Sequence, residues 1–283
     1  MGKRLGKALS QLVLGLGLVE KPWRRADTRL RVAEALLPRH RVETRHGPLE
    51  FVTTHPQGLQ YPRDFATREP ETLAWIDGFA TPCRFWDIGA NIGVFSLYAA
   101  LRSGVEICAF EPAAASYAAL CRNLEANRLT DRVAAYCVAI GAAVELGRLN
   151  LSGINAGSVF NAFESTEDCF GRPLDIVARQ GAMGFSIDGF RRLFGLPAPN
   201  YLKIDVDSIE ERILAGAEET LRDPELRSVL IELEHEESAR RKRMVAALAA
   251  AGFLPAANGA RQAGVVNAIF VREAQPVAAR RHA

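Results

Sequence analysis

The stretch FWDIGANIG, residues 85–93, decides the fold of this chain. It has the pattern of a buried strand that ends at a glycine-containing turn, and the apolar residues 94–101 then continue as a helix. A strand, a glycine-rich turn and a helix in this order present backbone N–H groups to a ligand at the helix N-terminus. Gly89 and Gly93 permit a tight turn because they lack a Cβ, and Asp87 stands where the strand leaves the sheet, so its carboxylate can point into the crevice there. The alternative is an ordinary strand–turn–helix with incidental glycines.

The spacing within this stretch distinguishes between ligands. Asp87, Gly89 and Gly93 form the pattern D-x-G-x-x-x-G, whereas dinucleotide-binding proteins carry G-x-G-x-x-G. A carboxylate beside the turn would repel a pyrophosphate. The same carboxylate suits a ligand that has an amino group and a cationic sulfur, so the spacing favours S-adenosylmethionine.

Charge is distributed unevenly along the 283 residues, of which 48% are hydrophobic and 24% charged. Eleven Lys and Arg against four Asp and Glu give residues 1–45 a formal charge of +7; since the whole chain carries +2, the remainder carries −5. The basic segment is either a solvated face or a contact for an acidic partner or a membrane surface. The apolar residues 9–19 are too few to span a bilayer. We expect them to form an amphipathic helix that docks on the body, with peripheral membrane contact as the alternative.

The five cysteines are scattered and include no C-x-x-C pair. This usage fits a reducing compartment and no zinc cluster. We therefore expect a cytoplasmic protein.

Strand and helix patterns alternate after residue 81, which predicts a mostly parallel α/β sheet. Expected strands end near residue 88 and cover 105–112, 133–140, 201–206 and 228–234, with helices over 94–101, 116–127, 187–194, 210–221 and 237–251. Residues 253–257 and 265–271 have no room for a helix between them, so we expect antiparallel neighbours.

The segments outside this alternation are less regular. Before it we expect a helix over 27–37, a strand over 49–54, an irregular lid or substrate wall over 57–69 and a helix over 70–79. Residues 147–170 are rich in Gly, Asn and Ser and are expected to be irregular, and their stretch 153–158 could line an acceptor pocket. The predicted domains are an N-terminal extension (1–80), an S-adenosylmethionine-binding domain (81–273) and a flexible tail (274–283).

Glu111 ends the second predicted strand, 24 residues after Asp87. A carboxylate in that place can accept hydrogen bonds from both ribose hydroxyls of a nucleoside. Pro112 then forces the chain out of the strand. The alternative for Glu111 is an acid that caps the next helix.

Three stretches together resemble the FkbM family of S-adenosylmethionine-dependent methyltransferases: FWDIGANIG, FEP at 110–112 and LKIDVDSIE at 202–210. Residues 65–72 and 229–232 are similar to the same family, so the resemblance spans roughly 65–272. It implies a class I, Rossmann-like sheet of seven strands, mostly parallel, with an antiparallel last strand. It also implies O-methyl transfer, usually to a sugar or natural-product hydroxyl. The residues that we expect to bind the cofactor are Asp87, Gly89, Ala90, Asn91, Gly93, Glu111 and Pro112.

The chain departs from the family pattern in one place. It has Asp207 and Ser208 where the family usually has Glu-Gly, which suggests a slightly different backbone. A second feature concerns the adenine: the third predicted strand ends at 140–141 without an acidic residue. We therefore expect backbone groups and apolar packing to hold the adenine.

A hydroxyl acceptor must lose its proton to a base, or to a metal that lowers its pKa. Asp205, Glu232 and His235 stand at the carboxyl ends of the fourth and fifth predicted strands and are the candidate catalytic residues. The resting pKa of a histidine suits a general base, although His235 also stands in an acidic run typical of a solvated face. The same three residues could form a divalent-metal site; no clear ligand set is indicated, and we assign no metal ligands.

Two further residues of the fourth-strand motif have structural interpretations. Lys203 shares a strand face with Asp205 because strand side chains alternate, and we expect it to pair with a buried acid. Glu210 is expected to help cap a helix at Ser208.

The sequence thus predicts an O-methyltransferase that acts on a hydroxyl of a sugar, glycan or glycolipid. Alternatives are a polyketide or peptide natural-product hydroxyl, a non-catalytic module that binds S-adenosylmethionine, and nicotinamide-dependent redox chemistry, which the absent G-x-G-x-x-G disfavours. Nucleic acid is not expected as a partner, because the chain beyond residue 45 is net acidic and would repel phosphate.

Overall fold

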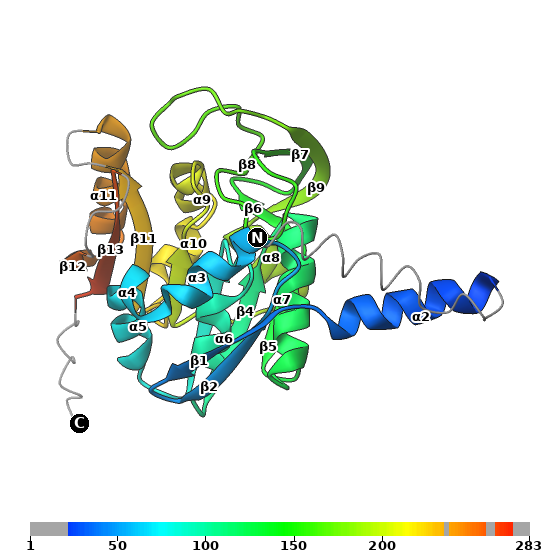
Figure 1. Cartoon of the computed structure of the whole chain (residues 1–283). Helices are drawn as coiled ribbons and strands as arrows, with labels where there is room; N and C mark the ends of the chain where they lie inside the picture. Colours follow the sequence, from blue (N-terminus) through cyan, green and yellow to red (C-terminus); the bar gives the residue numbers. More distant parts are fainter. Residues whose placement is uncertain (1–21, 235–237, 259–263, 274–283) are drawn as a thin grey trace.

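A seven-stranded sheet forms the centre of the computed structural model, which describes residues 22–234, 238–258 and 264–273 (Figure 1). The strand order is β12-β13-β11-β10-β3-β4-β5. β13 runs antiparallel to both of its neighbours and the other neighbouring pairs are parallel. The predicted mostly parallel sheet with an antiparallel last strand is confirmed. The strands are β3 (Cys83–Ile88), β4 (Val105–Phe110), β5 (Val133–Tyr136), β10 (Tyr201–Ile204), β11 (Ser228–Glu234), β12 (Phe253–Asn258) and β13 (Val265–Arg272).

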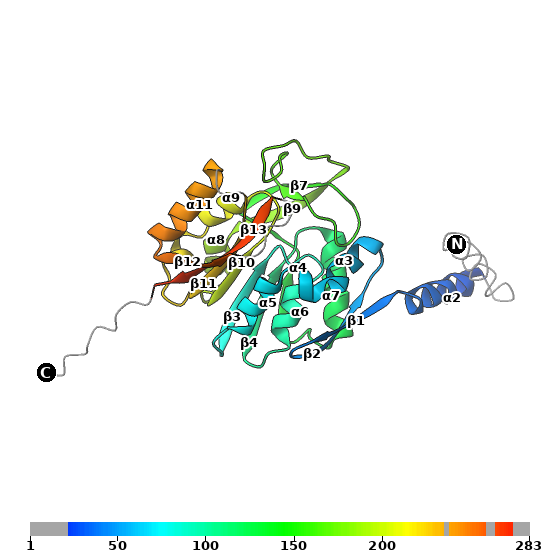
Figure 2. The ribbon, with the colours of Figure 1, turned by 60° about the vertical axis from the view of Figure 1, so that its left-hand side comes forward.

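Helices cover both faces of this sheet (Figure 2). One face packs against α5 (Pro70–Asp77), α6 (Val94–Ala100) and α7 (Ala114–Ala126). The other packs against α8 (Ile187–Phe194), α9 (Glu210–Ala215), α10 (Glu218–Arg222) and α11 (Ala239–Ala250). Neighbouring strand residues serve opposite cores, Phe85 one and Trp86 the other, because their side chains alternate across the sheet. Burial on both faces explains why the parallel strands are nearly continuous apolar runs.

The N-terminal extension begins with α2 (Pro22–Ala35), which projects away from the body in Figures 1 and 2. A hairpin follows, β1 (Arg39–Thr44) and β2 (Gly47–Val52). β2 buries Leu49 and Phe51, and Asn123 of α7 accepts a hydrogen bond from the Val52 N–H at 2.8 Å. The sequence did not predict β1, whose residues are all polar except Val42 and are never fully buried. The expected helix over residues 9–19 lies outside the described residues.

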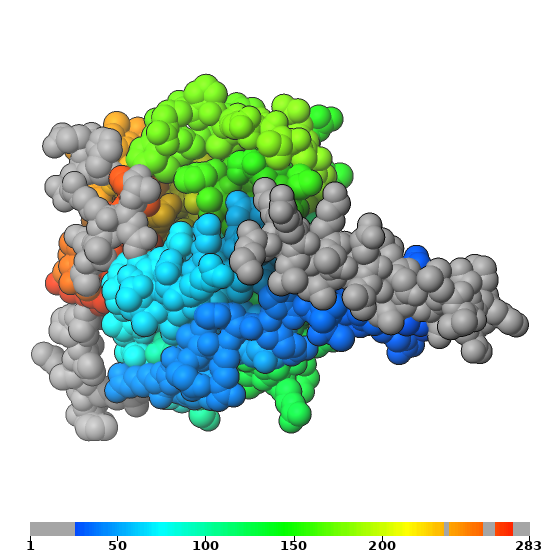
Figure 3. All heavy atoms as spheres, viewed as in Figure 1, coloured from blue at the N-terminus to red at the C-terminus, as the bar shows by residue number. Residues whose placement is uncertain are grey.

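The segment 57–69, expected to be irregular, is instead short helices: the 3-10 turn η1 (Pro56–Leu59), α3 (Gln60–Arg63) and α4 (Phe65–Arg68). That prediction was wrong, because single helical turns are too short to show a periodic pattern. In Figure 3 the light-blue to cyan residues lie on the face in view, below the green residues around 140–180.

The predicted third strand divides into two pieces. β5 belongs to the central sheet, whereas β6 (Ala139–Gly141) joins a separate four-stranded sheet of order β6-β9-β7-β8. Its other strands are β7 (Glu145–Leu151), β8 (Ala162–Phe163) and β9 (Ala178–Ser186), so the expected irregularity of 147–170 is only partly correct. β9 was not predicted because its glycines are untypical of a strand. Gly184 is needed there because a Cβ on it would lie 2.5 Å from the Phe163 ring.

The predicted helix over 210–221 is also two helices, α9 and α10. The break is at Gly216, where a Cβ would lie 2.5 Å from the carbonyl oxygen of Gly141. Because the backbone of Gly141 approaches so closely, only a glycine fits at position 216 without a shift of the chain. Across the part of the chain that the structure covers, no helix has the length and apolar character needed to cross a membrane.

Candidate active site

The two glycines of the 85–93 stretch are both required by the packing around the turn. Gly89 has a φ of +84°, and a Cβ on it would lie 1.8 Å from the carbonyl oxygen of Asp205. Gly93 has a φ of +91°, and its Cβ would lie 2.4 Å from a methyl group of Leu120. A side chain at Gly89 would displace the backbone just beyond β10, and one at Gly93 would displace the side chains of Leu120 and Leu97, in both cases on a backbone with positive φ. Incidental glycines are therefore excluded, and the turn lies directly against the end of β10.

Asp87 lies beneath this turn and is fully buried, rather than exposed in a crevice. The register of β3 with β10 places it beside Lys203, one residue before the strand ends. Its Oδ2 accepts a hydrogen bond from the Ser96 hydroxyl at 2.6 Å, while Oδ1 has no hydrogen-bond partner among the described residues. Burial raises the pKa of Asp87, and the charge of Lys203 opposes that shift.

Glu111 lies against the same turn. One carboxylate oxygen accepts the N–H of Asn91 and the other that of Ala113, both at 2.8 Å. The second bond holds the residue just before α7, but α7 has no side-chain cap, so the capping alternative is not observed. Each oxygen keeps a lone pair for a ligand. Burial raises the pKa of Glu111 to about 7 despite these two bonds. The side-chain oxygen of Asn91 is buried and has no partner in the described part of the chain.

A small apolar cavity lies beside the turn. Gly89 and Pro112 line it, together with Val138, Ile140 and Phe163, and no acidic residue does. That the adenine is held by apolar packing and backbone groups stays a prediction, for which this cavity is the candidate place.

Lys203 connects the turn to the neighbouring strand end. The side chain is 1% exposed, and its Nζ lies 2.6 Å from Asp205 Oδ2 and 4.0 Å from Asp87 Oδ1. The ammonium also lies 5.0 Å from the centre of the Phe95 ring. Burial opposes the charge of Lys203, but the charges of Asp205 and Asp87 outweigh it and hold its pKa above the ordinary value. The predicted pairing of Lys203 with a buried acid is confirmed.

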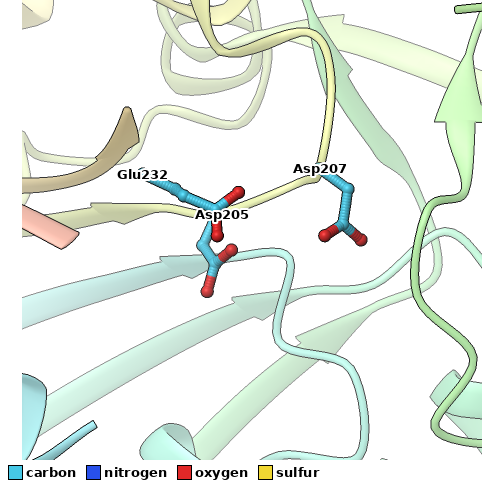
Figure 4. A group of neighbouring side chains, drawn as sticks. All are labelled: Asp205, Asp207 and Glu232. Atoms are coloured by element: carbon cyan, nitrogen blue, oxygen red, sulfur yellow. The ribbon is translucent and has the colours of Figure 1, made fainter. Parts of the chain in front are cut away.

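Three carboxylates gather where β10 and β11 end. Asp205 and Asp207 follow β10, Glu232 belongs to β11, and their oxygen atoms lie within 4.8 Å of one another (Figure 4). Asp207 accepts the N–H of Phe160 at 2.8 Å. Glu232 makes no hydrogen bond or ion pair with any residue that the structure describes. Burial, then the charge of Asp205, raises the pKa of Asp207 to about 7 and that of Glu232 to about 10.

These carboxylates form one wall of a cavity of about 130 Å³. Tyr61, Phe160 and Phe170 supply aromatic walls, and the Arg68 guanidinium lies over the Tyr61 ring, 3.9 Å from its centre. The segment 57–69 thus contributes to the cavity as expected, although it is helical. From the other side the lining residues are Val159 and Phe160, just beyond the predicted stretch 153–158.

The structure brings together some of the predicted catalytic residues and adds others. Asp205 and Glu232 are adjacent, whereas His235 lies outside the described residues. Asp207 belonged to the fourth-strand motif and could have been found from its spacing of two from Asp205. Asn267, which also lines the cavity, comes from β13 and has no sequence signal, because only the antiparallel register places it opposite Glu232.

The predicted cap at Ser208 was wrong. Helix α9 has Ile209 at its N-cap position without a side-chain bond. Glu210 instead accepts the N–H of Val206 at 3.2 Å and forms an ion pair with Arg240. The carboxylate therefore fixes the loop that carries Asp207.

Comparisons with known proteins agree with this geometry. Residues 87–255 match the family model of the methyltransferase FkbM domain. A curated relative is the 31-O-demethyl-FK506 methyltransferase FkbM of Streptomyces tacrolimicus, 29% identical over 201 residues, which cover 59% of this chain and 71% of the relative.

Solved structures with a similar fold include a methyltransferase FkbM from Methylobacillus flagellatus, with a TM-score of 0.49 and 13% identity over 77% of this chain and 56% of that one. Another is Aeropyrum pernix fibrillarin in complex with S-adenosylmethionine, with a TM-score of 0.44 and 13% identity over 82% of this chain and 93% of that one.

The residues around the turn fit S-adenosylmethionine. Among the described residues, Asp87 Oδ1 and Asn91 Oδ1 are buried acceptors without a hydrogen-bond donor, and such atoms are costly unless a donor reaches them. The amino group of the cofactor supplies N–H donors of the right kind, and Glu111 has free lone pairs for ribose hydroxyls.

Proposed function

Because the chain belongs to the FkbM family of S-adenosylmethionine-dependent methyltransferases, we propose that it transfers a methyl group to the oxygen of a hydroxyl on a sugar, glycan or glycolipid. S-adenosylmethionine, when bound, supplies an electrophilic methyl group. What the protein must add is alignment of the acceptor and removal of its proton.

The observation that carries this proposal is the composition of the 130 Å³ cavity. It combines aromatic rings, Tyr61, Phe160 and Phe170, with the carboxylates Asp205 and Glu232. A sugar ring has apolar C–H faces that pack on aromatic rings and adjacent hydroxyls that donate to carboxylates. A purely apolar acceptor would bring no donor to the half-buried Glu232 carboxylate, which has no hydrogen-bond partner among the described residues.

Among the three carboxylates, Glu232 is best placed to act as the general base. Asp205 already bonds Lys203 and Asp207 already bonds the Phe160 N–H, whereas Glu232 has no described partner. With a pKa of about 10, the Glu232 carboxyl holds a proton at neutral pH, so it can act as a base only when that pKa is lowered. Positive charge brought into the cavity would lower that pKa and favour the ionised form.

A natural-product hydroxyl is the second candidate acceptor. It is favoured by the relative from Streptomyces tacrolimicus, which is named for methylating 31-O-demethyl-FK506. The two candidates differ in the acceptor alone, since both need the same turn and the same carboxylates.

The test is a transfer assay with S-adenosylmethionine that carries a deuterated methyl group. The protein is incubated with a panel of glycans and glycolipids and a matched panel of polyketide and peptide hydroxyl compounds, and the products are read by mass spectrometry. We expect label in the sugar panel, and loss of transfer in Glu232→Gln with unchanged binding of S-adenosylhomocysteine. Label only in the second panel would replace the sugar by a natural product. Tight cofactor binding without transfer to any compound would favour a non-catalytic module.

A further inference from the structure

We propose that Asp205, Asp207 and Glu232, together with the side-chain oxygen of Asn267, bind a divalent cation such as Mg²⁺ or Mn²⁺ in the acceptor cavity. Figure 4 shows the three carboxylates, two from the loop after β10 and one from β11. Their oxygen atoms lie within 4.8 Å of one another, close enough to surround one ion. Oxygen ligands of this kind are preferred by Mg²⁺, Mn²⁺ and Ca²⁺.

The register of the sheet places Asp205, Glu232 and Asn267 side by side on neighbouring strands, at the same height along the strand direction. Ile204 of β10 pairs with Ile231 of β11, so Asp205 and Glu232 each stand one residue beyond that pair. Glu232 in turn lies directly opposite Asn267 of β13. Directly opposed residues of an antiparallel pair point to the same face with Cβ atoms about 5 Å apart. The amide of Asn267 is therefore beside the Glu232 carboxylate, and both line the same cavity.

The side-chain oxygen of Asn267 is an independent observation that points to a cation. Its side chain is 9% exposed, and its Nδ2 donates to Glu69 at 2.9 Å and to Glu71 at 3.3 Å. These two bonds to carboxylates fix which end of the amide carries the oxygen, because a carboxylate can only accept from the nitrogen end. Oδ1 is then a buried acceptor with no partner in the part of the chain that the structure describes. A cation satisfies such an oxygen, whereas a further carboxylate cannot.

The charges that face the cluster do not balance it. Lys203, bonded to Asp205, and Arg68, on the cavity wall, carry two positive charges, whereas Glu69 and Glu71 add two more acids to the three of the cluster. Carboxylates held this close repel one another unless protons or a cation compensate them. A divalent cation compensates two of the three charges and uses the oxygens that lack partners.

A cation in this position would lie beside the acceptor hydroxyl and lower its pKa. Glu232 could then accept the hydroxyl proton through the oxygen that does not bind the cation. This role rests on the proposed function, whereas the binding site itself does not.

The test is the binding of the metal alone. Untagged protein is titrated with Mn²⁺, followed by electron paramagnetic resonance, and with Mg²⁺, followed by calorimetry. The variants are Asp207→Asn, Glu232→Gln and Asn267→Ala, with Glu106→Gln as matched control, because Glu106 is an exposed carboxylate on β4. The amide variants keep the shape of the side chain and remove repulsion, so they should fold. Unchanged binding of S-adenosylhomocysteine checks that they do.

We expect one ion per chain in the natural sequence and in Glu106→Gln, with affinity at least about tenfold weaker in both carboxylate variants. Mg²⁺ should also raise the melting temperature of the natural protein but not that of the carboxylate variants. No binding by the natural protein at millimolar metal, or equal binding by all variants, overturns the proposal. Metal binding without methyl transfer to sugars would contradict only the proposed acceptor, so the two failures are distinguishable.

Discussion

Lys203 Nζ lies 2.6 Å from Asp205 Oδ2 and 4.0 Å from Asp87 Oδ1, so one buried ammonium joins the two halves of the site. Asp87 lies in β3, beneath the turn expected to hold the methyl donor. Asp205 belongs to the wall of the acceptor cavity. A single cation thereby fixes the position of the acceptor wall relative to the donor turn.

Replacing Lys203 by Met should lower the free energy of unfolding by about 3–5 kcal/mol, because it leaves the buried Asp87 carboxylate uncompensated. Urea denaturation measures the change. The control is Arg222→Met, which removes an exposed ion pair with Glu218 and should cost about 0–1 kcal/mol. Equal losses in the two variants would show that the ammonium is not an essential partner of these acids.

Replacing Gly89 by Ala should abolish binding of S-adenosylhomocysteine, because the new Cβ would lie 1.8 Å from the Asp205 carbonyl oxygen and displace the turn. Gly171→Ala is the matched control: Gly171 also has a positive φ, +73°, but nothing lies within 4 Å of its Cβ position. The control therefore bears only the conformational cost of about 1–2 kcal/mol. Calorimetry distinguishes the two, and retained binding in Gly89→Ala would contradict the assigned role of the turn.

The affinity for S-adenosylhomocysteine should rise as the pH is raised from about 6 to about 8, because ribose hydroxyls donate to the ionised form of Glu111. Burial raises the pKa of this carboxyl to about 7 in the unliganded protein. Titrations at several pH values measure the slope, and Glu111→Gln should bind more weakly and remove it.

The same shift has a consequence for stability. A carboxyl whose pKa is higher in the folded than in the unfolded protein contributes stability at low pH, and this contribution is lost as the pH rises through about 7. As the pH rises from about 4.5 to about 7, the free energy of unfolding of the unliganded natural protein should therefore fall more than that of Glu111→Gln. A larger loss in the variant would contradict the assignment.

Replacing Tyr61 by Ala should raise the KM for a sugar acceptor by about 3- to 10-fold, as expected for one aromatic contact. Tyr61 lines the acceptor cavity and does not line the apolar cavity beside the turn. The dissociation constant of S-adenosylhomocysteine should therefore stay unchanged. A variant that weakens cofactor binding but leaves the acceptor KM unchanged would place Tyr61 at the other end of the site.

The parallel core could be predicted from the sequence because its signals are local. Strand β11 and helix α8 were predicted with their observed bounds, and the turn at Gly89 was recognised from residues that adjoin it. The predictions failed where distant contacts decide the structure. The predicted helix over 210–221 breaks at Gly216 because the backbone of Gly141 lies against it, and no pattern within the helix shows that.

The same limit applies to the site. Asp205 follows β10 and Glu232 lies near the end of β11, two strands that could be recognised, so their meeting at one sheet edge was predictable. Asn267 was not, because its place beside Glu232 depends on the antiparallel register of β13. Tyr61 comes from a single helical turn that the sequence pattern does not reveal.

The most direct measurement of the proposed activity is a nuclear magnetic resonance spectrum of the sugar product made with an isotopically labelled methyl donor. The chemical shift of the labelled methyl group identifies the atom to which it is bound. We predict one O-methyl resonance that appears with the natural protein and is lost with Glu232→Gln. A labelled methyl group on nitrogen or carbon, or no labelled product while S-adenosylhomocysteine still binds, would contradict O-methyl transfer.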